Sequence, residues 1–213
     1  YWGAQTQRSI ANFPFPPHER MPIGIIYGLA HVKRAAALTH KTSGALPAEI
    51  TDAIIAATDA ILARRHDTEF PLVIWQTGSG TQSNMNVNEV IAGIANEALA
   101  GTRGGKTPVH PNDHVNMGQS SNDVFPSAVH LAALDEITND LLPALDLLAA
   151  LLVLGLVLGG LLHHALDVSV IEAGVRGDGD LLVLARRHVL GVNGEDAVRV
   201  DVERDLDLRH AAR

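Results

Sequence analysis

Many residue types disappear from this chain after about residue 150. Residues 151–213 contain no Lys, Gln, Thr, Pro, Met, Phe, Tyr or Trp, and Leu and Val together fill 25 of those 63 positions. A folded domain usually takes aromatic side chains for its core and turn-forming residues for its loops. We therefore interpret residues 151–213 as an aberrant tail, and our hypothesis is a translation artefact in which a wrong reading frame or strand is read. The alternative is a genuine β or mixed segment rich in Leu and Val.

The first 150 residues indicate a mainly α-helical fold. Strand-type alternation is rare, whereas apolar residues recur at helical spacing. The predicted helices span residues 23–37, 47–65, 85–99 and 125–150. Gly44 is expected to end the first helix, and Arg64 and Arg65 are expected to place cations at the end of the second. Prolines concentrated between residues 14 and 22 predict an irregular surface segment over residues 1–22.

Composition excludes several classes of protein. Lys and Arg number 16 against 24 Asp and Glu, for a net charge of -8, so the basic stripe of a nucleic-acid binder is absent. The lack of Cys excludes disulfide frameworks, thiolate zinc sites and Cys nucleophiles, and a cytoplasmic location is expected. The longest uncharged apolar run, Leu147–Leu162, is shorter than the roughly 20 residues that span a bilayer, so no membrane helix is predicted. The first residues resemble no secretory signal and lack an initiator Met, so we expect the chain to begin inside a longer protein.

Residues 76–86 form a first polar segment directly ahead of a predicted helix. Gly78 and Gly80 permit close approach of the backbone, and neutral donors near a helix N-terminus suit an anion. The donors are the side chains of Ser79, Thr81, Ser83 and Asn84. The alternative is a helix cap in which Ser83 or Asn84 satisfies free backbone amides. The Gly-Lys-Ser/Thr ending of a phosphate loop is missing.

Residues 110–123 form a second polar segment, again ahead of a predicted helix. Its neutral donors next to the helix start are Ser120, Ser121 and Asn122. His110, Asp113 and His114 could suggest metal binding, but the pair of His lacks a helical context, Pro111 breaks the turn between them and no Cys helps, so no metal site is predicted. Asp113 is equally suited to capping a loop. A Ser-His-Asp hydrolase is disfavoured because no Gly-x-Ser-x-Gly elbow occurs.

Together the two polar segments suit a small, multiply charged anion such as a dicarboxylate. Hydroxyl and amide groups can surround such an anion while Lys and Arg stay sparse. This chemistry does not by itself name a reaction.

Residues 1–148 contain long, ordered motifs: residues 2–9, the Phe70-Pro71-Leu72 triplet, residues 75–86 and residues 110–125. These motifs give this part of the chain a close resemblance to class II fumarate hydratases of the fumarase/aspartase superfamily. It implies a lyase N-terminal domain over residues 1–116 and the start of a central long-helix domain over residues 117–150. It also implies reversible hydration of fumarate to (S)-malate without metal or organic cofactor, in a homotetramer whose active sites each draw on three subunits.

The resemblance also implies roles for individual residues. Those implied to bind substrate are Ser79, Gly80, Thr81, Ser120, Ser121 and Asn122. Those implied to form a secondary dicarboxylate site near the entrance are His110, Asn112 and Asp113.

Two segments that family members carry downstream do not occur in this chain. One is a Gly-Arg-Thr-His segment, and the other is a mobile Gly-Ser-Ser-x-Met-Pro-x-Lys-x-Asn loop that supplies the base region and a cation. His163, His164 and His188 lie in contexts that do not match, so no catalytic residue is identified and the chain alone is expected to be inactive. The alternatives are another lyase of the superfamily, such as an aspartate ammonia-lyase, or an inactive dicarboxylate-binding fragment.

Overall fold

The computed structural model describes residues 1–176, with side chains described for residues 1–169. Contacts between residues divide the chain into two units, Tyr1–Asp146 and Leu147–Arg213. His188 and most of the predicted aberrant tail lie outside the described residues. The predicted boundary between residues 116 and 117 stays a prediction.

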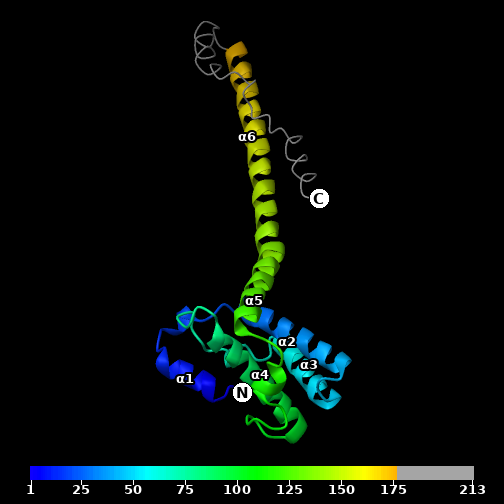
Figure 1. The fold of residues 1–213 in the computed structure, drawn as a ribbon. Coiled ribbons are helices and arrows are strands. Elements are labelled where there is room, and N and C mark those ends of the chain that lie inside the picture. The colour runs from blue at the N-terminus through cyan, green and yellow to red at the C-terminus, as the bar shows by residue number, and fades with distance from the viewer. Residues whose placement is uncertain (177–213) are drawn as a thin grey trace. The chain divides into compact units, whose positions relative to one another are not determined.

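The described residues are helical and carry no strand beyond an isolated bridge between Arg20 and Val73. The predicted mainly α fold is confirmed. The α-helices, shown in Figure 1, are α1 (Ala4–Asn12), α2 (Ile23–Ser43), α3 (Ala48–Leu62), α4 (Thr81–Ala100), α5 (Ser121–Glu136) and α6 (Leu142–Arg176). Shorter helical turns are η1 (Pro17–Glu19), η2 (Asp67–Glu69), η3 (Pro111–Val115) and η4 (Ile137–Leu141).

Helix α4 is the centre of the first unit. It contacts α1, α2, α3 and α5, and twelve of its twenty residues are buried. Val87, Val90 and Ile91 have no exposed surface and join the core with apolar residues of α2 and α3. Helices α2 and α3 pack side by side, with Arg34 paired to Asp59 and Lys41 paired to Asp52 across them. Helix α4 is therefore surrounded by neighbours that come from distant parts of the sequence.

The prediction of an irregular surface segment over residues 1–22 was wrong for α1. The four prolines all lie after this helix, and its N-terminus is satisfied by a side chain from α4. The Glu89 carboxylate accepts hydrogen bonds from the backbone N–H groups of Gly3, Gln5 and Thr6 at 2.9 to 3.0 Å. It also accepts from the Thr6 hydroxyl at 2.7 Å. Local sequence could not reveal this helix because its cap lies more than eighty residues away.

Several predicted helix ends moved. Helix α2 continues beyond residue 37 and ends, as predicted, at Gly44, whose φ of 70° is left-handed. Helix α3 ends at Leu62, so Arg64 and Arg65 lie beyond its last turn and the predicted placement of cations was wrong. Helix α4 begins at Thr81, four residues before the predicted start.

The fourth predicted helix is both earlier and longer than residues 125–150. It begins at Ser121 and continues through η4 and α6 to Arg176. One stretch of this helix, Ser121–Ser169, is long and apolar enough to cross a membrane by length and composition, criteria that core helices of soluble proteins also meet. The uncharged apolar run Leu147–Leu162 is therefore only part of the longer helical stretch that meets these criteria.

Candidate substrate site

In the first polar segment, the hydroxyls of Ser79 and Thr81 do not cap the helix that follows. Helix α4 has Gly80 at its N-cap position, which offers no side chain. Gln76 caps instead: its Oε1 accepts from the Ser83 backbone N–H at 3.0 Å, and its Nε2 donates to the Ser83 hydroxyl at 2.8 Å. The alternative interpretation, a cap made by Ser83 or Asn84, is therefore not what the structure shows. Ser79 and Thr81 remain available to another partner.

Gly80 is required by both backbone and space. Its φ is 64°, a left-handed conformation that side chains disfavour. A Cβ at this position would lie 2.2 Å from ring atoms of Phe125 on α5. The start of α4 and the first turns of α5 are therefore in direct contact at Gly80.

This contact brings the two polar segments together. The Ser79 hydroxyl lies 2.9 Å from the Thr81 hydroxyl, which lies 3.2 Å from the Ser121 hydroxyl. Three neutral hydroxyls from segments forty residues apart thus form one connected group at the N-termini of two helices. Such termini carry partial positive charge and free N–H groups, so the group lies where an anion is favoured.

A pocket of about 300 Å³ adjoins these hydroxyls. Ser79 and Asn122 line it together, so both polar segments reach it. The other lining residues are Gly78, Phe125, Pro126, Val129 and His130. His130 was missed by sequence reasoning, although its spacing of eight residues from Asn122 places both on one face of a helix.

Ser120 does something different from its neighbours. Its hydroxyl accepts from the Asn122 backbone N–H at 3.3 Å and so caps α5. The structure therefore brings Ser79, Thr81, Ser121 and Asn122 to one place, while the Ser120 side chain serves the helix end.

The three residues of the predicted secondary site share one turn, η3. Pro111 is the first residue of this turn, so the expectation that it breaks the turn between His110 and His114 was wrong. The His110 ring accepts through Nδ1 from the backbone N–H groups of Asn112 and Asp113 at 3.2 and 3.1 Å. The same nitrogen lies 3.4 Å from the Asp113 carboxylate. His110, rather than Asp113, is the cap, and these two N–H groups are already used within the turn.

A polar core made of Lys33, Asn84, Asn88 and Asn116 joins α2, α4 and the segment between η3 and α5. Lys33 has no exposed surface, and its Nζ donates to the Asn116 Oδ1 at 2.7 Å. Asn84 and Asn88 donate to the same oxygen at 3.2 and 3.3 Å. Burial lowers the pKa of Lys33 to about 7, because leaving water disfavours the charged ammonium. Sequence reasoning missed this core, although Lys33 continues the apolar spacing of Ile26, Leu29 and Ala30.

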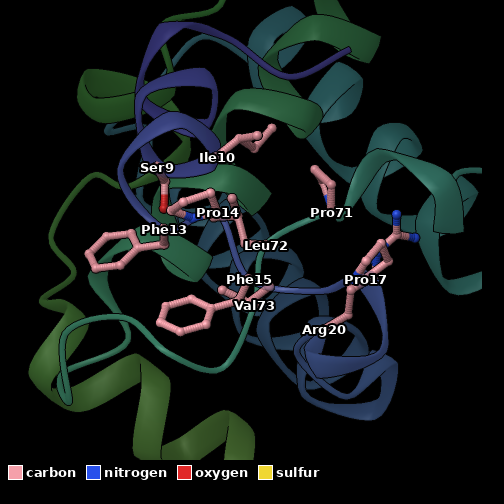
Figure 2. Close-up of a pocket in the computed structure, with 10 residues that line it drawn as sticks. All are labelled: Ser9, Ile10, Phe13, Pro14, Phe15, Pro17, Arg20, Pro71, Leu72 and Val73. Carbon is pink, nitrogen blue, oxygen red and sulfur yellow. The ribbon is translucent and has the colours of Figure 1, made fainter.

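A further pocket, of about 350 Å³, contains none of the predicted site residues. Figure 2 shows Phe13 and Phe15 on one side of it, with Leu72 and Val73 of the segment before α4 nearby. The remaining lining residues are Ser9, Ile10, Pro14, Pro17, Arg20 and Pro71.

The model of a family described as a lyase matches residues 1–153 of the chain. The chain belongs to the lyase family. The predicted resemblance to class II fumarate hydratases is confirmed by the relatives below.

The chain is 60% identical over 146 residues to a class II fumarate hydratase of Methylorubrum extorquens, covering 68% of this chain and 31% of that protein. It is 55% identical over 166 residues to a class II fumarate hydratase of Pseudomonas putida, covering 78% of this chain and 35% of that protein. The chain thus spans about a third of the length of these relatives.

Solved structures agree with the sequence comparison. The chain matches the class II fumarase of Schistosoma mansoni with a TM-score of 0.66 and 50% identity, over 68% of this chain and 31% of that one. It matches a fumarate lyase:delta crystallin of Brucella melitensis with a TM-score of 0.59 and 43% identity, over 63% of this chain and 30% of that one. The predicted fumarase/aspartase-like architecture is therefore confirmed for the first unit.

The last part of the chain matches the model of a different family. A model described as NAD-specific glutamate dehydrogenase matches residues 120–213 and overlaps the lyase match from residue 120 to residue 153. The lyase match ends close to the composition break at residue 150. The aberrant-tail interpretation stays a prediction.

Proposed function

We propose that this chain is the N-terminal portion of a class II fumarate hydratase and supplies part of the site that holds fumarate and (S)-malate. The observation that carries the proposal is the group formed by Ser79, Thr81 and Ser121, whose hydroxyls connect at 2.9 and 3.2 Å across two distant segments. The identity of 60% with a class II fumarate hydratase supports the assignment of substrate.

The three clustered hydroxyls of Ser79, Thr81 and Ser121 are chemically suited to bind one carboxylate of a dicarboxylate. Hydroxyl donors and the Asn122 amide can direct hydrogen bonds at carboxylate oxygens without bringing a fixed charge. Removal of the proton next to a malate carboxylate makes that carboxylate a dianion, and donors already in place stabilise the added charge. Each such donor contributes roughly 3 kcal/mol to the transition state in comparable oxyanion sites.

The rest of the catalytic apparatus belongs to the proposal for the whole protein. Proton transfer and a cation are not assigned to any residue of this chain, so the chain alone is expected to be inactive. A homotetramer, a cytoplasmic location and a place in the tricarboxylic acid cycle are proposed from the relatives. The secondary dicarboxylate site at His110, Asn112 and Asp113 and the domain limits 1–116 and 117–150 are proposed from the resemblance to class II fumarate hydratases. The aberrant tail is proposed from the narrow composition of residues 151–213.

A chimaera tests the function. Residues 1–146 of this chain would replace the matching segment of the Methylorubrum extorquens relative, which is 60% identical over 146 residues. The chimaera is expected to hydrate fumarate, measured as loss of fumarate absorbance and formation of malate. A chimaera that assembles like the intact relative but leaves fumarate unchanged contradicts the proposal. Aspartate-dependent formation of fumarate in its place would support an ammonia-lyase.

Single substitutions in the active chimaera test the site. Thr81→Ala and Asn122→Ala should each lower turnover by roughly 10²-fold, because each removes a donor aimed at the developing charge. The matched controls are Thr102→Ala and Asn139→Ala, which change exposed residues outside the pocket. Near-normal turnover in the Thr81 and Asn122 variants would refute their assignment to the substrate.

A further inference from the structure

We propose that Lys33 is a positioning residue that, through Asn116, holds the Ser120–Asn122 segment against the first turn of α4. The proposal gives this buried lysine, which the substrate site does not contain, a role in the shape of that site. It rests on the proposed function only for the statement that the positioned residues bind substrate.

Two successive hydrogen bonds connect α2 to the residue before the Ser120–Asn122 segment. Lys33 donates from Nζ to the Asn116 Oδ1 at 2.7 Å, and Asn116 donates from Nδ2 to the Gln119 carbonyl at 3.2 Å. Gln119 immediately precedes the cap of α5. The Lys33 donor therefore acts, through Asn116, on the residue that directly precedes the Ser120–Asn122 segment.

The same oxygen ties this segment to α4. The amides of Asn84 and Asn88 also donate to the Asn116 Oδ1. Asn84 lies one helical turn after Thr81, the residue whose hydroxyl meets Ser121. A shift of Asn116 would consequently alter the distance between the Thr81 hydroxyl on α4 and the Ser121 hydroxyl on α5.

Stability alone does not explain a lysine at this place. Lys33 has no exposed surface and forms no ion pair within residues 1–169. A buried ammonium without a carboxylate destabilises a fold, and apolar replacements of buried charges are often neutral or stabilising. Lys33 continues the apolar stripe of α2, where a Met of similar length could pack. What Met cannot supply is the donor to Asn116.

Hydrogen exchange in the full 213-residue chain, measured without ligand, tests the proposal. The reporting amides are bonded within the positioned segment: Gln119 to the Asn116 carbonyl, and Asp123 and Val124 to the Ser120 carbonyl. In Lys33→Met their protection should fall by about tenfold, which corresponds to the loss of one charged hydrogen bond. Amides of α3 report global stability and should keep their protection or gain some.

Two further variants sharpen the result. Lys41→Met is the matched control, because Lys41 lies on the same helix but is exposed and paired with Asp52; it should leave the reporting amides unchanged. Asn116→Ala removes the contact from the other side and should give the same local loss, and combining it with Lys33→Met should add nothing. Should Lys33→Met fail to fold, Asn116→Ala carries the test.

The proposal is overturned if Lys33→Met leaves the reporting amides as protected as before, or if protection falls equally in α3. Either result would assign Lys33 a purely structural role. Because no substrate is present, neither result depends on whether the chain binds fumarate.

Discussion

Helices α4 and α6 differ in how far their side chains are buried. Twelve of the twenty residues of α4 are buried, and these include Asn84, Asn86, Asn88 and Asn96. Helix α6 is much richer in Leu, yet its leucines are exposed; Leu156, for example, is 71% exposed. Apolar content therefore does not identify the core of this chain. Burial follows from the neighbours that surround a helix, and α4 has them on several sides.

The difference has a consequence for function. Polar side chains in α4 are costly to bury unless they are bonded, so the bonds that they make fix the helix and its neighbours in one arrangement. Helix α6 carries apolar residues around its whole circumference and makes no comparable set of specific bonds among the described residues. We therefore expect α4 to specify the site, and α6 to drive association.

The largest expected effect is on association. The full chain should form assemblies many times its mass of 22.6 kDa, because a long exposed apolar surface promotes self-association. A chain of residues 1–146 should elute as a monomer and unfold cooperatively. Size-exclusion chromatography with light scattering makes the comparison, and a chain of residues 1–176, which keeps α6, is the control. A monomeric full chain with a cooperative transition would contradict this expectation.

The next effect concerns the helix cap that α4 provides. In residues 1–146, Glu89→Ala should lower the free energy of unfolding by about 4 kcal/mol, because buried donors without a partner each cost about 1–3 kcal/mol. Urea denaturation measures this change. Glu49→Ala, an exposed carboxylate in the first turn of α3, should change it by less than about 1 kcal/mol. If both variants lose a similar free energy of unfolding, Glu89 contributes no more than a favourable interaction with a helix dipole.

A smaller loss is expected at the junction of the two polar segments. Gly80→Ala should cost about 3 kcal/mol, since a left-handed Ala costs about 1–2 kcal/mol and the clash with Phe125 adds to it. Gly78→Ala is the matched control because a Cβ there meets nothing within 4 Å. Denaturation of both variants decides the point. Equal stabilities would show that α4 and α5 separate at Gly80 without penalty.

The smallest expected effect is the pH dependence of the polar core. The pKa of Lys33 is about 7 in the folded chain and near 10.5 when unfolded, so the unfolded state binds more protons between these values. The free energy of unfolding should therefore rise with pH, by about 2 kcal/mol between pH 7 and pH 9. Denaturation of residues 1–146 at several pH values measures the slope. Lys33→Met should remove it, and a slope that persists in this variant would assign it to another group.

The two polar segments show how far the sequence reaches. Glycines, hydroxyls and amides ahead of helices predicted an anion site, and the structure brings Ser79, Thr81, Ser121 and Asn122 close together. That they bind an anion stays a prediction. The prediction could not say that Gln76 caps α4 or that Ser120 caps α5. Those roles depend on which side chain reaches a free N–H group first, and several residues in each segment have suitable chemistry.

Two other features could not be predicted because they join distant residues. Helix α1 needs Glu89, and Asn116 needs Lys33, yet neither pairing leaves a local pattern in the sequence. Lys33 came closest to a signal, because it occupies an apolar position of a predicted helix. His130 likewise shares a helix face with Asn122, but only the pocket shows that the two residues belong together.

The sequence by itself determined the helical class, the helix formers, the break near residue 150 and the neutral donors at two helix starts, because these properties follow from local periodicity and side-chain chemistry. Tertiary structure alone decided which donors meet, which are used for capping and which apolar residues are buried. The meeting of Thr81 with Ser121 depends on a contact between residues forty positions apart. The bonds of Glu89 to α1 and of Lys33 to Asn116 join residues more than eighty positions apart. Such contacts are set by packing around α4.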